Sequence, residues 1–414
     1  MRPIFAAILL AILAGLAVFF SFFFRPKFTV SVDPATANVT FGGQTATGSR
    51  AFTVMPGLHE LSVELPGYIP LKRTERLTVG QRRSITIKLK LVPEPTPLTT
   101  ESVLLVGLSS DGESALYVGN TGKTLFTREA GEQRALTPDS FNRPSVFRLS
   151  PTQDVVLLEN PNGDVFLHDF KRYNLVEQEQ FLYGRDIGEF DWVNPTGEKI
   201  LYTYAPASGE RSLVLADRTN RVLERVVNLQ EAGITNPTVS VAVDGKTAVL
   251  ISRPGEDFTS YHLFLFDLFT KRAKQLTTDG GKVDALLAPT GSRILFTRFE
   301  QDPDSINNQL LSVMDLDGRN RKDFNLRATL DDVAFLNDTT ILVAVSSKEG
   351  SRLTRLDLAT GEEEPYFIQF PGPLFIGKVI LSADKKSVYL TGSSQVREQY
   401  GTLYEVTLET DEYE

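Results

Sequence analysis

The chain has 414 residues, of which 41% are hydrophobic and 23% are charged, and its formal net charge at pH 7 is −9. This length and composition predict two or three ordinary globular domains, and the absence of cysteine excludes disulfides, thiolate metal sites and a thiol nucleophile. The acidic residues gather after residue 92, which argues against a nucleic-acid partner, because binding to phosphates requires clustered cations.

An apolar run without charge extends over Ile4–Phe24. As a helix with about 1.5 Å per residue, this run spans a bilayer core of roughly 30 Å. A cleavable signal peptide has a shorter apolar region followed by small residues, whereas Phe22–Lys27 contains no small residue. We therefore expect a transmembrane helix in residues 1–27 and a single-pass protein of the cell membrane, with the remaining chain outside the cytoplasm. The flanking positive charges are nearly balanced and leave the orientation open.

Apolar and polar residues alternate in four short stretches of residues 28–92, which glycine and proline separate: Phe28–Val32, Asn38–Phe41, Leu58–Leu65 and Ser84–Leu91. A period of two predicts strands with one buried face, and this set of strands predicts a small β-sandwich. A stiff proline-rich linker, residues 93–97, marks the expected domain boundary.

The turns of this region have a specific sequence pattern. Its parts are Asp33–Val39, the Gly42-Gly43 turn, Gly48, Met55–Val63 and Pro66–Tyr68. In these segments the region resembles the PEGA domain family, although Pro34–Ala37 stands where the family has the tetrapeptide that names it. The resemblance implies a bacterial surface protein and a non-catalytic spacer or adhesion domain.

From residue 98 onward, an apolar run, a tight polar turn and a second apolar run recur seven times. The residues that mark the turns follow one another at steps of 41 to 48 residues: Asp111, Thr152, Thr196, Asp244, Thr290, Asn337 and Asp384. A period of this length, with four short strands per repeat, is typical of a β-propeller. We therefore predict a seven-bladed β-propeller over residues 98–414 and an all-β chain after the transmembrane helix.

Other features recur within the repeats. Third strands end in a residue pair whose second member is aspartate, as at Asp217, Asp267 and Asp357, and some fourth strands end in Leu-Thr. With these features the region resembles WD40-like and TolB-like bacterial propellers, which implies the propeller fold. The last repeat lacks a clear fourth strand, whereas Thr96–Thr100 resembles the end of one. We expect this N-terminal segment to complete the last blade and close the ring.

The sequence offers little catalytic chemistry. Its three histidines have no partner at metalloprotease or serine-hydrolase spacing: His59, His168 and His262. The acidic loop Glu300–Asn308 offers calcium ligands at Asp302, Asp304 and Asn307. It lacks the ligand spacing of an EF-hand loop, and we interpret it as a solvated loop. We predict no catalytic residue, no cofactor and no metal site.

The loops between second and third strands are long, whereas the turns between first and second strands are tight. In a propeller these long loops lie on one face, and elaboration of one face indicates a binding surface. Aromatic and polar side chains together are typical of recognition surfaces. The residues predicted to bind a partner are Asp257, Tyr261, Asp302, Asn307, Arg397 and Tyr400.

We therefore expect a non-catalytic scaffold or recognition protein, anchored in the membrane, that binds an envelope protein or a glycan through one face of the propeller. The alternative is an enzyme that acts on glycans or peptidoglycan, which requires paired carboxylates in the central funnel. The candidates for that pair are Asp191, Glu256 and Asp302.

Overall fold

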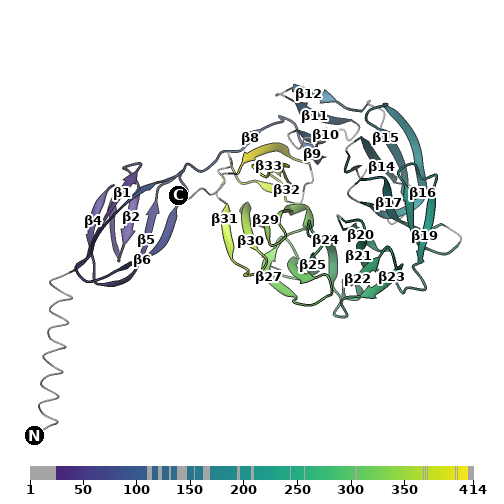
Figure 1. Ribbon diagram of the computed structural model, residues 1–414. Helices are drawn as coiled ribbons and strands as arrows, with labels where there is room; N and C mark the ends of the chain where they lie inside the picture. Colours follow the sequence, from purple (N-terminus) through teal and green to yellow (C-terminus); the bar gives the residue numbers. More distant parts are fainter. Residues whose placement is uncertain are drawn as a thin grey trace, which may run out of the picture. The chain divides into compact units, whose positions relative to one another are not determined.

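The computed structural model describes residues 25–408 apart from short gaps. The gaps are residues 110–113, 120–123, 130–131, 138–146, 153, 162–167, 194–195, 207–208, 243, 256, 304, 367, 369, 371, 397 and 399. The chain divides between Pro93 and Glu94 into two compact units. Both units are built from antiparallel or mixed β-sheets (Figure 1).

The structure corrects the prediction of a transmembrane helix and, with it, the prediction of a single-pass membrane protein. Within the described ranges, no helix is long and apolar enough to cross a membrane. The helical segments there are two 3-10 turns, η1 (Phe258–Ser260) and η2 (Leu330–Asp332). Ile4–Phe24, which motivated the prediction, lies outside the described residues. Where the chain is described, apolar residues recur with the period of strands, so the fold is all-β.

The first unit contains two facing sheets with the strand orders β4-β1-β7 and β3-β2-β5-β6. The strands are β1 (Lys27–Asp33), β2 (Asn38–Phe41), β3 (Gln44–Thr47), β4 (Arg50–Thr53), β5 (Gly57–Glu64), β6 (Leu71–Leu77) and β7 (Arg82–Lys88). Strands β1 and β7 run parallel, and the other pairs are antiparallel. Phe28 and Phe52 from one sheet and Phe41 from the other are buried in the core between them. The alternating apolar residues of the sequence therefore form one shared core.

The second unit contains seven four-stranded blades arranged around a ring (Figure 1). Blade 1 contains β9 (Val103–Leu108), β10 (Ala115–Gly119), β11 (Leu125–Glu129) and β12 (Glu132–Ala135). Blades 2 and 3 contain β13 (Phe147–Leu149), β14 (Val155–Pro161), β15 (His168–Asn174), β16 (Glu179–Val193), β17 (Lys199–Tyr204), β18 (Ser212–Asp217) and β19 (Leu223–Asn228).

The remaining blades follow the same order from the channel outward. Blade 4 contains β20 (Thr238–Val241), β21 (Thr247–Ser252), β22 (His262–Asp267) and β23 (Arg272–Gln275). Blade 5 contains β24 (Lys282–Leu287), β25 (Arg293–Phe299), β26 (Gln309–Asp315) and β27 (Lys322–Arg327). Blade 6 contains β28 (Val333–Asn337), β29 (Thr340–Ser347), β30 (Gly350–Asp357) and β31 (Glu363–Tyr366). Blade 7 contains β32 (Phe375–Leu381), β33 (Ser387–Ser393), β34 (Thr402–Thr407) and β8 (Thr96–Pro97).

Blade 7 closes the ring as the sequence predicted. Strand β8, which precedes blade 1 in the sequence, pairs antiparallel with β34 near the end of the described chain. The backbone N–H of Leu98 donates to the carbonyl of Leu403 (2.7 Å), and the N–H of Leu403 donates to Thr99 Oγ1 (3.1 Å). The two ends of the propeller chain therefore share one sheet, which leaves no open edge at the end of the ring.

Blades 2 and 3 share a strand. The first half of β16 pairs with β15 as the outer strand of blade 2, and its second half pairs with β17 as the inner strand of blade 3. Ile187 pairs with residues on both sides, and the preceding Asp186 has a positive φ of 54°. The two blades therefore form one continuous seven-stranded sheet without a connecting loop.

Neighbouring blades pack through buried apolar side chains. Blades 7 and 1 share a cluster that includes Tyr389 and Leu403 from one and Val103 and Tyr117 from the other. Trp192 is buried between blades 2 and 3. The second strands are the most buried, because apolar side chains on both of their faces contact neighbouring blades.

The aspartates that end third strands accept hydrogen bonds from the turn that follows. Asp267 Oδ1 accepts the backbone N–H groups of Phe269 and Thr270 at 2.9 and 2.7 Å. Asp357 Oδ1 accepts those of Ala359 and Thr360 at 2.8 and 2.7 Å. These hydrogen bonds fix the turn to the fourth strand and lower the pKa of each carboxyl.

Candidate functional site

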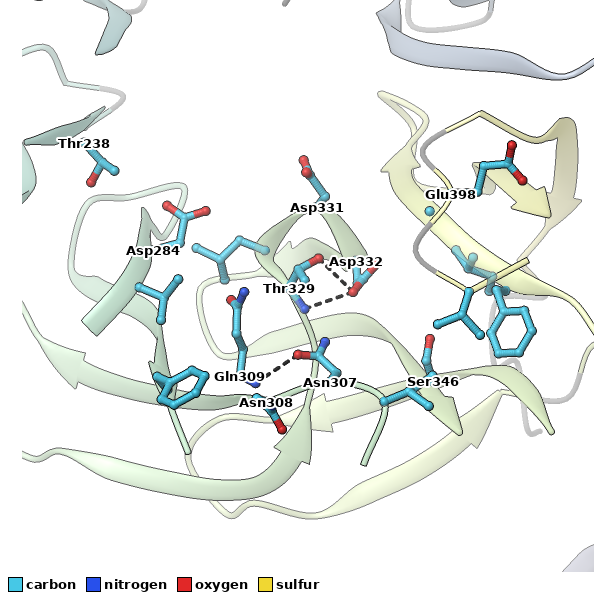
Figure 2. Close-up of a pocket in the computed structure, with 18 of the residues that line it drawn as sticks. Thr238, Asp284, Asn307, Asn308, Gln309, Thr329, Asp331, Asp332, Ser346 and Glu398 are labelled. Carbon is cyan, nitrogen blue, oxygen red and sulfur yellow. Dashed lines mark hydrogen bonds between the residues drawn. The ribbon is translucent and has the colours of Figure 1, made fainter. Parts of the chain in front are cut away.

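A cavity of about 690 Å³ opens at the mouth of the central channel (Figure 2). Its walls come from the first strands of blades 2 to 5 and 7 and from η2 before the first strand of blade 6. The loops that follow the second strands of blades 4, 5 and 7 also line it, as does Ser346 near the end of the second strand of blade 6. First strands begin, and second strands end, at the same edge of a blade. The cavity therefore lies on the face that carries the long loops.

The six residues predicted to bind a partner are not gathered in this cavity. Asn307 lines it, and its Oδ1 accepts the backbone N–H of Gln309 at 2.9 Å. The carboxylate of Asp302 lies 3.3 Å from Arg327 Nη2. Tyr400 is half-buried and does not line the cavity. Arg397 lies outside the described residues.

Two of the six residues stabilise their own loop. Tyr261 is buried in the core between blades 4 and 5, and its hydroxyl donates to the carbonyl of Gly255. Asp257 is exposed, and its Oδ1 accepts the N–H and the hydroxyl of Thr259 at 2.9 and 2.7 Å. These hydrogen bonds lower the pKa of the Asp257 carboxyl. Neither side chain lines the cavity.

The carboxylates proposed for the enzymatic alternative do not form a pair. Asp191 accepts the N–H of Trp192 on Oδ1 and the N–H of Val241 on Oδ2, both at 2.8 Å, so it ties blade 3 to blade 4. Burial raises the pKa of the Asp191 carboxyl, and the two hydrogen bonds oppose this effect. Glu256 lies outside the described residues, and Asp302 is ion-paired as described above.

The sequence analysis missed the charged residues that the first strands and η2 bring to the channel. Asp284 lies in β24, Asp331 in η2, and Arg148 in β13, and all three line the cavity. Figure 2 shows the carboxylates of Asp284 and Asp331 pointing into the open space. Lys378 lies in β32 of blade 7. The available signal was a charged residue within an otherwise apolar first strand, as in Phe375–Leu381.

Burial dominates the electrostatics of this site. It raises the pKa of Asp284 to about 6, and the carboxylates of Asp331 and Glu189 reinforce the shift, whereas Arg148 opposes it. Burial lowers the pKa of Lys378, Asp331 opposes this shift, and the positive charge of Arg148 reinforces it. Arg148 therefore lies close enough to the side chains of blades 5 and 7 to influence both across the channel.

Other charged residues of the cavity have partners. Arg253 Nη2 lies 2.9 Å from Glu189 Oε1 and joins blade 4 to blade 3. Asp332 Oδ2 accepts the N–H and the hydroxyl of Thr329 at 2.9 and 2.8 Å, while burial raises its pKa to about 6. Glu398 Oε2 accepts the hydroxyl of Ser393 at 2.7 Å. Within the described ranges, no group of three or more His, Asp or Glu residues could hold a metal ion.

No protein-family model and no curated protein matches the sequence. The structure is similar to that of oligogalacturonate lyase in complex with manganese, with a TM-score of 0.54 and 12% identity over 76% of this chain and 92% of that chain. It is also similar to the Cps50 (Swd1) β-propeller domain of Myceliophteria thermophila, with a TM-score of 0.51 and 12% identity over 76% of this chain and 100% of that chain.

TolB from Acinetobacter baumannii has a TM-score of 0.41 and 14% identity over 73% of this chain and 78% of that chain, which is too low to support an inference. At the identities of the first two structures, the similarity shows the fold alone. The second unit has the fold of a β-propeller, which the oligogalacturonate lyase and the Cps50 (Swd1) β-propeller domain share.

Proposed function

We propose that this chain is a non-catalytic recognition protein that binds its partner at the mouth of the central channel. The observation that supports this proposal is the cavity of about 690 Å³, which lies in the size range of ligand sites. Six blades contribute to its walls, so an inserted group would meet side chains from nearly the whole ring. First strands hold nine of the 22 lining residues, and such rigid elements favour binding without reorganisation.

The partner that we propose is a protein or a glycan of the bacterial envelope. The resemblance of residues 28–92 to the PEGA family supports this, and the sandwich would act as a spacer that displays the propeller. Nucleic acid is a poor candidate, because the cavity walls contain more carboxylates than cations. A partner loop or chain end that enters the cavity would meet Asn307 and Gln309 as hydrogen-bonding groups.

Photo-cross-linking on the full chain tests the proposal. A photoreactive residue in place of Asn307 is expected to form one dominant adduct in an envelope extract, which mass spectrometry would identify. As a control, the same photoreactive residue is placed at Lys246, in the tight turn between β20 and β21. This turn lies on the other face of the propeller, so the control should give no such adduct.

A matched pair of substitutions sharpens this test. Ser346→Trp places an indole in the cavity, whereas Ser347→Trp changes the next residue, which is exposed and does not line it. The adduct should disappear with Ser346→Trp and persist with Ser347→Trp. An adduct that persists in both variants would exclude the channel mouth as the binding site.

One observation favours an enzyme as the second candidate. Asp284 has a pKa raised to about 6 and lies within the electrostatic influence of the Asp331 carboxylate. A protonated acid near an ionised carboxylate is the combination that glycoside hydrolysis uses. A hydrolytic rate on envelope glycans that Asp284→Asn abolishes, while Asp191→Asn retains it, would establish this candidate. Absence of any rate in the unmodified protein would reject it.

A further inference from the structure

We propose that the channel mouth recognises a zwitterionic group of the partner, with its ammonium toward Asp284 and Asp331 and its carboxylate toward Arg148 and Lys378. The inference rests on the proposed function and specifies the ligand of that site. A free amino acid unit, or a peptide segment whose two ends are both free, has this chemistry.

The charged side chains of the channel fall into two groups, those with a partner among the described residues and those without. Glu189 and Arg253 form an ion pair, and Asp332 and Glu398 accept hydrogen bonds from hydroxyl groups. The side chains of Arg148, Asp331 and Lys378 make no ion pair or hydrogen bond with any described residue, and Asp284 accepts only the N–H of its neighbour Ala285 (2.8 Å). We call these four residues the channel charge set: Arg148, Asp284, Asp331 and Lys378.

The acids and the cations of the channel charge set lie on different blades of the ring. Its two acids come from the adjacent blades 5 and 6, and its two cations come from blades 7 and 2. Between the cations lies blade 1, whose inner strand Val103–Leu108 has no charged residue. Within this set, the acids therefore lie on one side of the channel and the cations on the other, while the cavity wall as a whole contains more carboxylates than cations.

Leaving these charges without partners costs desolvation free energy. Burial disfavours the charged forms of Asp284 and Lys378, and their pKa shifts show that this desolvation outweighs the attraction of the opposite charges across the channel. Both groups nevertheless keep some exposed surface. Asp284 lines the cavity, and Lys378 directly follows the lining residue Gly377 in β32. A buried charge without a partner is costly, and an added counter-charge removes that cost.

The signs of these charges determine which class of ligand fits the channel. A cation alone would satisfy the acids but repel Arg148 and Lys378, and an anion alone would do the reverse. A zwitterion satisfies both sides without changing the net charge of the channel. Charge-assisted hydrogen bonds to carboxylate and guanidinium groups are among the stronger polar contacts in proteins. The dipolar arrangement also fixes the orientation of the bound group.

The experiment uses the full chain and three small probes: triglycine, N-acetyl-triglycine and triglycinamide. Affinities are measured by saturation-transfer NMR and titration calorimetry. We expect triglycine to bind, and each cap to weaken binding by roughly tenfold or more, because each cap removes one charge. Asp331→Asn should reduce the effect of acetylation, and Lys378→Met should reduce the effect of amidation. Asp257→Asn, outside the cavity, should change neither ratio.

Two outcomes of the binding measurements would contradict the inference. Equal affinities for the three probes would show that the charges of the ligand are not recognised, and failure of triglycine to bind would show the same for this class. If the adduct at Asn307 still forms and is lost with Ser346→Trp, the proposed recognition function stands and only the zwitterionic ligand is rejected. If the adduct is also absent, both are rejected.

Discussion

Asp191 and Asp284 lie in the first strands of blades 3 and 5, and each carboxylate accepts the N–H of the following residue. They differ in the second oxygen. Asp191 Oδ2 accepts the N–H of Val241 from the next blade, whereas Asp284 has no further hydrogen bond among the described residues and points into the channel (Figure 2). A buried carboxylate in this ring thus joins two blades where a backbone N–H of the next blade reaches its second oxygen. Where no such N–H reaches it, the second oxygen is available to a ligand.

The largest effect is expected from removing the carboxylate that joins two blades. Asp191→Ala leaves the N–H groups of Trp192 and Val241 without their acceptor in a buried site, and should lower the free energy of unfolding by about 3 kcal/mol. Asp191→Asn keeps one acceptor oxygen and should cost about half as much. Urea unfolding at pH 7 measures both. Equal stability of the alanine variant and the unmodified protein would show that this hydrogen bond does not hold the blades.

The opposite sign is expected at Asp284. Its folded-state pKa is about 6, above the value of about 4 in an unfolded chain. Its contribution to the free energy of unfolding therefore falls as the pH rises from about 4 to 6. Asp284→Asn keeps an acceptor for Ala285 and should stabilise the protein at pH 7.5 by at most about 3 kcal/mol. The gain should vanish near pH 4, as unfolding at both pH values would show.

We expect Asp284→Asn to weaken binding at the channel mouth as well as to stabilise the fold. A substitution that stabilises the fold and impairs function is typical of a functional site. Stabilisation without any loss of binding would instead identify Asp284 as an incidental buried acid.

A smaller effect is expected at the ion pair between blades 3 and 4. Arg253→Met removes the contact of 2.9 Å with Glu189 and should lower the free energy of unfolding by about 1 kcal/mol or less, because solvent reaches both side chains. The loss should decrease further in high salt. Thermal unfolding at two salt concentrations measures it, and a salt-independent loss would indicate packing rather than charge.

The smallest effect is expected at Asp257, whose hydrogen bonds with described residues are all within its own loop. Asp257→Ala should change the free energy of unfolding by about 0.5 kcal/mol or less and leave the cross-link at Asn307 unchanged. A strong loss of the adduct would return this loop to the binding surface that the sequence analysis predicted.

The sequence supported the repeats, the aspartate turns and the closure of the ring, because these depend on local patterns and on one missing strand. Thr96–Thr100 could be placed in blade 7 because the last repeat had no other fourth strand. The channel charge set could not be predicted in the same way. Arg148 and Lys378 are 230 residues apart in the sequence, and only the closed ring brings their charges together.

The loop residues show the opposite limitation. Tyr261 and Asp302 were chosen because aromatic and acidic side chains in long loops are typical of binding surfaces. The structure uses Tyr261 in the core between blades and Asp302 in an ion pair with Arg327. A loop must first satisfy its own polar groups and anchor itself to the blades. Residue type alone does not distinguish that role from recognition.

The pairing of β8 with β34 also orders the assembly of the propeller in time. Thr99 and Leu403, which are hydrogen-bonded, are 304 residues apart, so β8 has no partner until nearly the whole ring has been synthesised. Contacts of such long separation form late and slow the folding of a domain. Until then, the blades made first have the edge of an incomplete sheet exposed. The segment that begins the propeller is therefore the last to pair, and it closes the ring only after the strands of blade 7 have formed.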